Sequence, residues 1–157
     1  DITLSINISP LFFIKEHFVP FIINSIEQRH LPPEQIILEI TEDTLINDTE
    51  TIKAKIDHLR RYGIKISLDD FGTGYSSLNY LRDIALDEIK VDKSFIDYLS
   101  FDPKAHSLFQ SIIEIARNFN YQVVAEGVES EDQVQLVSEA GCYLIQGYYY
   151  SRPEKIE

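Results

Sequence analysis

Short apolar runs alternate with longer helical patterns along this chain, and this alternation limits the possible folds more than any other feature. Strands that alternate with helices form a parallel sheet with helical crossovers. Two architectures fit that pattern, an open doubly wound sheet and a (β/α)8 barrel. The predicted strands span 2–8, 36–41, 64–69, 88–92, 121–126 and 143–150, and the predicted helical segments span about 10–30, 48–62, 76–82, 103–119 and 130–141.

Capping signals set the predicted ends of the helices. Ser9 with Pro10 at the first helical position, Asp102 with Pro103, and Ser130 each predict a helix start. Asp48 is the expected cap of the helix that ends at Tyr62, where Gly63 supplies a left-handed stop. Pro20 predicts a kink or break inside the long first helical segment.

Polar residues near the carboxyl ends of the strands decide between the two architectures. An open sheet gathers its ligand at one switch point, which only a few strands supply. A barrel gathers residues from every strand end into one mouth. A polar residue on each of the six predicted strands therefore favours the barrel, with Asn7, Glu39, Asp69, Lys90, Glu126 and Gln146 in these places.

Length limits how much of a barrel this chain can supply. A complete barrel takes about 250 residues and eight βα units. With 157 residues and about six units, the chain is expected to be one domain, residues 1–157, that lacks the amino-terminal units.

Composition excludes several classes of partner. The net charge of −12 makes a nucleic acid polymer or an anionic membrane a poor partner, because phosphate binding needs clustered Lys and Arg. A small anionic substrate is still compatible with this charge if metal ions bridge the substrate to acidic residues. Cys142 is the one cysteine, so no internal disulfide can form. No apolar run reaches the roughly 18 residues of a membrane-spanning helix, and we expect a cytoplasmic domain, with membrane anchoring of the parent protein left open.

The acidic residues predict a metal site. Carboxylate and amide oxygens suit Mg²⁺, Mn²⁺ or Ca²⁺ rather than metals that prefer thiolates. Carboxylates that converge without metal would repel one another, whereas two divalent ions about 3.5–4 Å apart recur in phosphate-ester hydrolysis. Asp69 is placed to bridge such ions, and the glycine-containing turn 71–74 can bring Asp70 back toward them. Lys90 is the cation of the set, suited to orient water or stabilise charge on a phosphoryl oxygen.

Each of these signals has a plainer interpretation when taken alone. Glu39 fits an exposed edge position, Lys90 fits a solvated lysine, and adjacent aspartates before glycine fit turn chemistry. Glu129 suits either a loop brace, a metal ligand or the first turn of the following helix. The functional interpretation comes from the combination across six strands.

Six stretches together resemble an EAL-type cyclic di-GMP phosphodiesterase domain over almost the whole chain. They are SINISP, LEITE, LDDFGTGYSSLNYL, IKVDKSFI, VVAEGVES and LIQGYYYSRP. The resemblance implies a barrel that hydrolyses cyclic di-GMP to linear pGpG with two Mg²⁺ or Mn²⁺ ions.

The resemblance also implies a role for each matching residue. Asn7 and Glu39 are expected to bind metal, Asp69 to bridge the two ions, and Asp70 to hold the second. It further implies that Lys90 touches the catalytic water, Glu126 serves the second metal or acts as base, and Glu129 holds the loop after Asp70. Gln146 is expected near the metals and water, and the substrate is expected to contact Gln146, Gly147 and Asp92. In the resembled family the loop after Asp70 lies at a dimer interface, so the resemblance implies a homodimer through this loop. It also implies a fused sensor or GGDEF-type domain in the parent protein.

The chain departs from the family in lacking the Glu-Ala-Leu motif, whose Glu binds metal and whose nearby Arg helps bind substrate. We therefore expect the isolated fragment to have low or no activity. The alternative is a non-catalytic cyclic di-GMP receptor or protein-interaction module. A third interpretation is another metal-dependent barrel that acts on carbonyl or sugar substrates.

Overall fold

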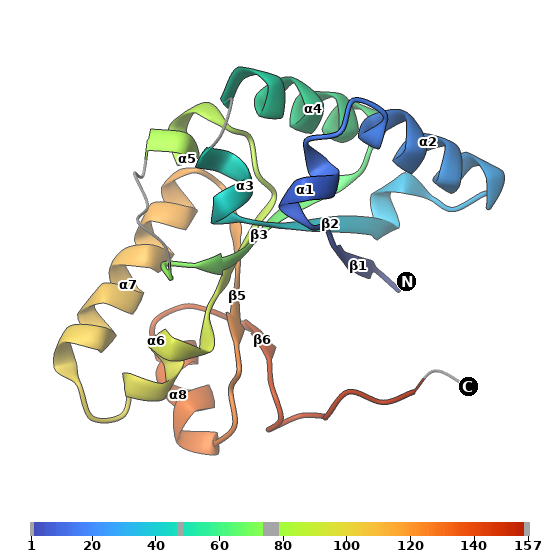
Figure 1. Cartoon of the computed structure of the whole chain (residues 1–157). Helices are drawn as coiled ribbons and strands as arrows, with labels where there is room; N and C mark the ends of the chain where they lie inside the picture. The colour runs from blue at the N-terminus through green and yellow to red at the C-terminus, as the bar shows by residue number, and fades with distance from the viewer. Residues whose placement is uncertain (1, 47–48, 74–78, 156–157) are drawn as a thin grey trace. The chain divides into compact units, whose positions relative to one another are not determined.

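The computed structural model describes residues 2–46, 49–73 and 79–155 (Figure 1). The chain divides into two compact units, Asp1–Glu88 and Ile89–Glu157. Each unit combines strands with helices, as the sequence predicts.

The first unit is built on three parallel strands, β1 (Leu4–Asn7), β2 (Ile36–Thr41) and β3 (Lys65–Phe71), in the order of the chain. The register places Asn7 beside Glu39 and Thr41 beside Asp69. The helical elements are α1 (Pro10–Phe13), α2 (Phe18–Gln28), the 3₁₀ turn η1 (Pro33–Gln35), α3 (Glu42–Ile46), α4 (Thr49–Tyr62) and α5 (Asn79–Asp83).

The apolar side chains of β2 and β3 form the core of the first unit. Leu38, Ile40, Ile66 and Leu68 are all fully buried. Helices α2 and α4 pack against each other (Figure 1). Because the alternate residues of these strands are buried, the polar residues at the strand ends keep a fixed direction.

The first predicted helix is divided in two, but the break comes before Pro20 rather than at it. Pro20 is the third residue of α2, where a backbone N–H would have no partner within the helix. Lys55 stabilises the break, because its Nζ donates to the carbonyls of Phe13 and Lys15, each at 2.8 Å. The predicted start is confirmed, since the Ser9 hydroxyl accepts from Phe12 N at 3.3 Å.

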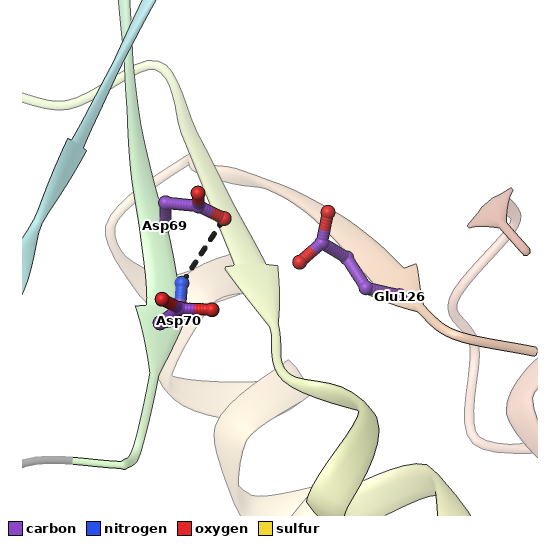
Figure 2. Close-up of side chains that lie close together, drawn as sticks. All are labelled: Asp69, Asp70 and Glu126. Carbon is purple, nitrogen blue, oxygen red and sulfur yellow. Dashed lines mark hydrogen bonds between the residues drawn. The ribbon is translucent and has the colours of Figure 1, made fainter. Parts of the chain in front are cut away.

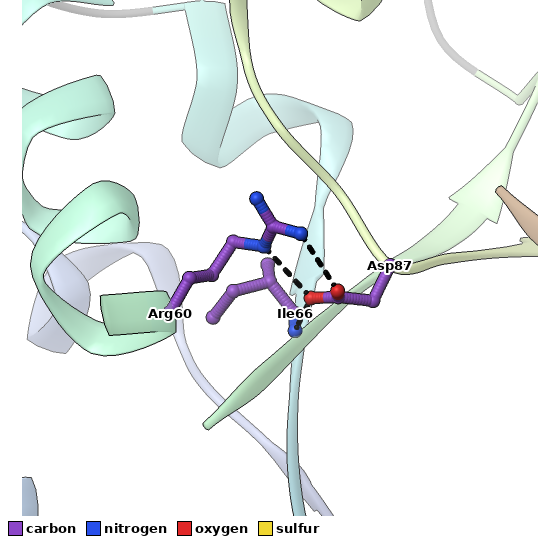
Figure 3. A network of polar contacts seen from close by, with 3 residues as sticks. All are labelled: Arg60, Ile66 and Asp87. Atoms are coloured by element: carbon purple, nitrogen blue, oxygen red, sulfur yellow. Dashed lines mark hydrogen bonds and ion pairs between the residues drawn. The ribbon is translucent and has the colours of Figure 1, made fainter. Parts of the chain in front are cut away.

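An ionic network fixes the amino end of β3 (Figure 3). The Arg60 guanidinium donates to both oxygens of Asp87, at 2.8 and 3.0 Å. Asp87 Oδ2 also accepts from Ile66 N at 2.9 Å. A cleft of about 780 Å³ opens beside this network, at the end of β3 away from Asp69.

The second unit contains strands in the order β4 (Glu88–Val91, whose first residue belongs to the other unit), β5 (Gln122–Glu126) and β6 (Leu144–Gln146). Strands β5 and β6 are parallel, with Glu126 beside Gln146. The helices are α6 (Lys93–Tyr98), α7 (Pro103–Asn118) and α8 (Glu131–Glu139).

Two predicted caps in this unit are confirmed. Asp102 accepts from Lys104 N at 2.8 Å, and Ser130 forms a capping box with Gln133. Asp92 caps α6, a helix that the sequence analysis does not predict. The expected cap Asp48 lies outside the described residues.

The last strand is shorter than predicted: it ends at Gln146 and not at Tyr150. Tyr150 N donates to Gly147 O at 3.1 Å, so the backbone turns after Gly147 instead of continuing along the sheet. Among the described helices, none is both long and apolar enough to cross a membrane.

Candidate active site

In the first unit, three predicted metal ligands lie together near the carboxyl ends of adjoining strands. Asn7 ends β1, Glu39 is on β2 and Asp69 is on β3. The Asn7 amide nitrogen lies 3.1 Å from Glu39 Oε2 and 3.2 Å from Asp69 Oδ2 when it is turned toward them. Parallel pairing brings these ends together, which is why residues far apart in sequence share one site.

The orientation of the Asn7 amide tests whether this group fits a cation. With its nitrogen inward, the amide donates to both carboxylates. With its oxygen inward, three acceptors would face one another, an arrangement that needs a positive ion between them. Glu39 is only 5% exposed, so its carboxylate lacks bulk water to compensate its charge. The donor set therefore fits a hard divalent cation.

Asp70 turns back because its own backbone is left-handed, with φ of 54°. Its N–H donates to Asp69 Oδ1 at 3.1 Å (Figure 2). The sequence analysis assigns this reversal to the turn at 71–74, and the structure shows that it begins one residue earlier. Aspartate tolerates this backbone region better than most residues. Gly72 follows with φ of 94°, and the Thr73 hydroxyl donates to Asp70 O at 2.9 Å.

Glu42 is a residue of this region that the sequence analysis missed. Its Oε1 accepts from Gly72 N at 3.0 Å, and the side chain is only 5% exposed. The sequence analysis assigns the holding of this loop to Glu129, and that assignment stays a prediction. The sequence signals for Glu42 are its place as the last residue of the LEITE stretch and its place as an acid in the first turn of α3, which by itself indicates only a favourable position.

In the second unit, Lys90 and Glu126 form a close ion pair. Lys90 Nζ lies 2.6 Å from Glu126 Oε1, and the two side chains are 7% and 17% exposed. Glu126 ends β5 and is also drawn in Figure 2. Because both groups are largely removed from water, each fixes the direction of the other. The pair joins two residues that the sequence analysis assigns to catalysis.

A pocket of about 540 Å³ lies beside this pair, and every residue that lines it belongs to the second unit. The lining includes Asp92, Glu126, Glu129, Gln146 and Gly147 from the predicted set. The sequence analysis did not single out Lys93 and Arg152, which line it as well. Glu129 pairs with Lys93 at 2.5 Å.

Gly147 occupies a place where no side chain fits. A Cβ there would lie 2.1 Å from Val128 O. The backbone beside it is tied down, because Val128 N donates to Gln146 O at 3.2 Å and Tyr149 N donates to Val128 O at 3.0 Å. Close backbone approach is therefore the reason for glycine at this wall of the pocket.

The predicted residues thus form two groups, one within each unit. Asn7, Glu39, Asp69 and Asp70 belong to the first, and Lys90, Asp92, Glu126, Glu129, Gln146 and Gly147 belong to the second. Most of the loop expected at a dimer interface, residues 74–78, lies outside the described residues.

Comparison with known proteins identifies the family. A model of the EAL domain family matches residues 1–153. The signaling protein YkoW of Bacillus subtilis is 40% identical over 98% of this chain and 19% of its own length. The bifunctional diguanylate cyclase/cyclic di-GMP phosphodiesterase MucR of Pseudomonas aeruginosa is 36% identical over 100% of this chain and 23% of its own length. The chain therefore spans about a fifth of these curated relatives.

Solved structures of similar proteins support the same assignment. A PaMucR phosphodiesterase in complex with c-di-GMP matches with a TM-score of 0.91 and 36% identity, over 96% of this chain and 61% of that one. The manganese and cy-diGMP complex of Klebsiella pneumoniae BlrP1 matches with a TM-score of 0.89 and 30% identity, over 96% of this chain and 39% of that one. These matches confirm the predicted α/β class of a (β/α)8 barrel, of which the chain carries part. The chain belongs to the EAL domain family.

Proposed function

We propose that this chain is part of a metal-dependent phosphodiesterase that hydrolyses cyclic di-GMP to linear pGpG. The observation that carries the proposal is the contact of Asn7 with both Glu39 and Asp69, an oxygen-rich group formed by three strand ends. Membership of the EAL family and the c-di-GMP bound to the PaMucR phosphodiesterase support the choice of substrate.

The proposed cofactor is a pair of Mg²⁺ or Mn²⁺ ions. Asn7, Glu39 and Asp69 would hold one side of the metal site, with Asp70 as a further ligand. The manganese complex of BlrP1 supports a divalent ion in this family. When bound, such ions supply positive charge to phosphate oxygens and lower the pKa of bound water.

We assign the remaining residues to substrate and proton handling. The ion pair with Glu126 holds the Lys90 ammonium in a fixed direction, suited to orient water or to stabilise charge on a phosphoryl oxygen. Glu126 would serve as a metal ligand or as base. Asp92, Gln146 and Gly147 line the pocket of the second unit, where they would contact the substrate. Glu129 stays assigned to holding a loop.

The decisive experiment measures cyclic di-GMP turnover by the natural full-length protein with Mg²⁺ or Mn²⁺. We expect linear pGpG from the wild type, and a loss of more than about a hundredfold in Glu39→Gln and Asp69→Asn. Glu16→Gln is the matched control, because Glu16 is an exposed acid of the same unit, in the segment between α1 and α2. Retained turnover in the two site variants would contradict the proposal.

Binding of cyclic di-GMP without product would also contradict it, in favour of a receptor module. The expected homodimer and fused domain are further proposals. The relative MucR is named both a diguanylate cyclase and a cyclic di-GMP phosphodiesterase, and this supports a fused GGDEF-type domain. Sedimentation of the full-length protein tests the homodimer, and a cytoplasmic location stays a prediction.

A further inference from the structure

Lys93 lies in the wall of the pocket of the second unit and contacts the segment that follows β5. Its Nζ forms an ion pair with Glu129 Oε1 at 2.5 Å. The hydrogen bond to Glu129 raises the pKa of the Lys93 ammonium. No role was assigned to this lysine from the sequence, where it follows Asp92 at the start of α6.

The aliphatic part of Lys93 lies against Gly127. A Cβ at Gly127 would lie 2.5 Å from both Cβ and Cγ of Lys93. Gly127 also has a left-handed backbone, with φ of 68°. Both observations mean that the Lys93 side chain packs directly on bare backbone, so the lysine contacts Gly127 and Glu129 at the same time.

The segment held by Lys93 is tied on its other side to the end of β6. Val128 lies between the two residues that Lys93 contacts, and its N–H donates to Gln146 O at 3.2 Å. Its carbonyl accepts from Tyr149 N at 3.0 Å. Gln146 and Gly147 line the same pocket as Lys93 and Glu129. A displacement of 127–129 would therefore also move the pocket residues Gln146 and Gly147.

Charge gives Lys93 a second role in this pocket. Asp92, Glu126 and Glu129 all contribute carboxylates to the lining. Lys90 offsets Glu126, and Lys93 offsets Glu129. An anionic ligand enters such a pocket only if the acids around it are compensated.

We infer that Lys93 is a positioning residue: it fixes Gly127–Glu129, and through Val128 the end of β6, in the shape that binds an anionic ligand. The identity of that ligand as cyclic di-GMP rests on the proposed function. The side chains of Lys93 and Glu129 are 42% and 46% exposed, so the ion pair contributes little to global stability. Its removal should change the pocket without unfolding the protein.

The test compares Lys93→Ala with Lys93→Arg in the natural full-length protein. Arginine keeps the positive charge and the aliphatic stem, whereas alanine removes both. Lys104→Ala is the matched control, because Lys104 is an exposed lysine of the same unit in the first turn of α7. The first measurement is hydrogen exchange of the Val128 and Tyr149 amides. We expect exchange about tenfold faster in Lys93→Ala and unchanged in the other two variants.

The second measurement is cyclic di-GMP hydrolysis with Mn²⁺. We expect Lys93→Ala to raise KM about tenfold with a smaller change in kcat, and Lys93→Arg to restore the wild-type values. Unchanged amide exchange in Lys93→Ala overturns the inference, whatever the kinetics show. Wild-type kinetics in Lys93→Ala also overturns it. Faster exchange in a protein whose wild type neither binds nor cleaves cyclic di-GMP refutes the proposed function but supports the positioning role.

Discussion

Glu42 Oε1 accepts a hydrogen bond from the backbone N–H of Gly72 at 3.0 Å, across 30 residues of sequence. The contact joins the first turn of α3 to the loop that follows Asp69 and Asp70. The backbone is left-handed at both Asp70 and Gly72, so the chain reverses its direction over residues 70–72, at the end of β3. Because the buried Glu42 carboxylate accepts from Gly72 N–H in this reversal, it fixes the direction in which Asp69 and Asp70 lie.

Glu42→Ala should therefore disturb both the loop and the activity. Hydrogen bonds to charged groups contribute about 1.5–3 kcal/mol, so we expect a loss of that order in the free energy of unfolding. On the proposed function, turnover of cyclic di-GMP should fall about ten- to a hundredfold, because the loop supports the proposed metal ligands Asp69 and Asp70. Urea unfolding and turnover assays measure the two effects.

Two further variants separate this contact from a general effect of charge. Asp43→Ala removes an exposed acid from the next position of α3 and should change neither quantity. Glu42→Gln keeps an oxygen acceptor and should lie between wild type and alanine. Equal results for Glu42→Ala and Asp43→Ala would contradict the role given to Glu42.

The left-handed backbone of Asp70 predicts an order of stability among its variants. Asparagine and glycine tolerate a φ of 54°, whereas alanine costs about 1–2 kcal/mol there. We expect Asp70→Asn and Asp70→Gly to unfold close to the wild type, and Asp70→Ala to unfold at lower denaturant. All three should lose turnover, since each removes the carboxylate. A fully active Asp70→Asn would show that the residue serves the backbone turn alone.

The network at the amino end of β3 predicts that replacing Asp87 lowers the free energy of unfolding more than replacing Arg60 does. Asp87→Ala removes the partner of Arg60 and also the acceptor of Ile66 N–H (Figure 3). Arg60→Ala leaves the bond from Ile66 in place. We expect Asp87→Ala to destabilise by about 1.5–3 kcal/mol and Arg60→Ala by less, as measured by urea unfolding.

High salt distinguishes the parts of this network. Screening should reduce the effect of Arg60→Ala, because the ion pair is part-exposed, and should change the effect of Asp87→Ala less. Arg61→Ala is the control, since the Arg61 guanidinium donates to Asp57 O within α4 and not to Asp87. If Arg60→Ala is the more destabilising variant, the acceptor role of Asp87 is wrong.

Cys142 should behave as an unreactive thiol in the folded protein. Burial raises its pKa to about 11, and its Sγ donates to Val123 O at 3.3 Å. The residue is only 2% exposed. Alkylation by iodoacetamide at pH 8 should be about a hundredfold slower than for an ordinary cysteine, because the thiolate reacts. Rapid labelling of the native protein would contradict this.

The same shift predicts a pH dependence of stability. The folded state holds the thiol proton up to about pH 11, whereas an unfolded cysteine loses it near pH 8.5. This contribution is complete below about pH 8.5 and is lost as the pH rises through about 11. Other groups titrate in this range, so the measurement is the difference between wild type and Cys142→Ala. A difference independent of pH between 8 and 11 would refute the assignment.

The sequence by itself determined the α/β class, the helix starts at Ser9, Asp102 and Ser130, and the group formed by Asn7, Glu39 and Asp69. Caps such as Ser9, Asp102 and Ser130 act within three residues, so a linear pattern contains them. The pairing of Asn7 with Glu39 followed from the carboxyl ends of neighbouring parallel strands. These features depend on local chemistry or on one rule of sheet topology.

The tertiary structure decided the contacts that join distant segments. Lys55 of α4 donates to backbone carbonyls at the end of α1. Glu42 accepts from Gly72 N–H, and Lys93 packs on Gly127. Each looks like an ordinary surface charge in the sequence, because its partner lies 30 or more residues away. A long charged side chain reaches many places, and only the packed core fixes which backbone group it meets.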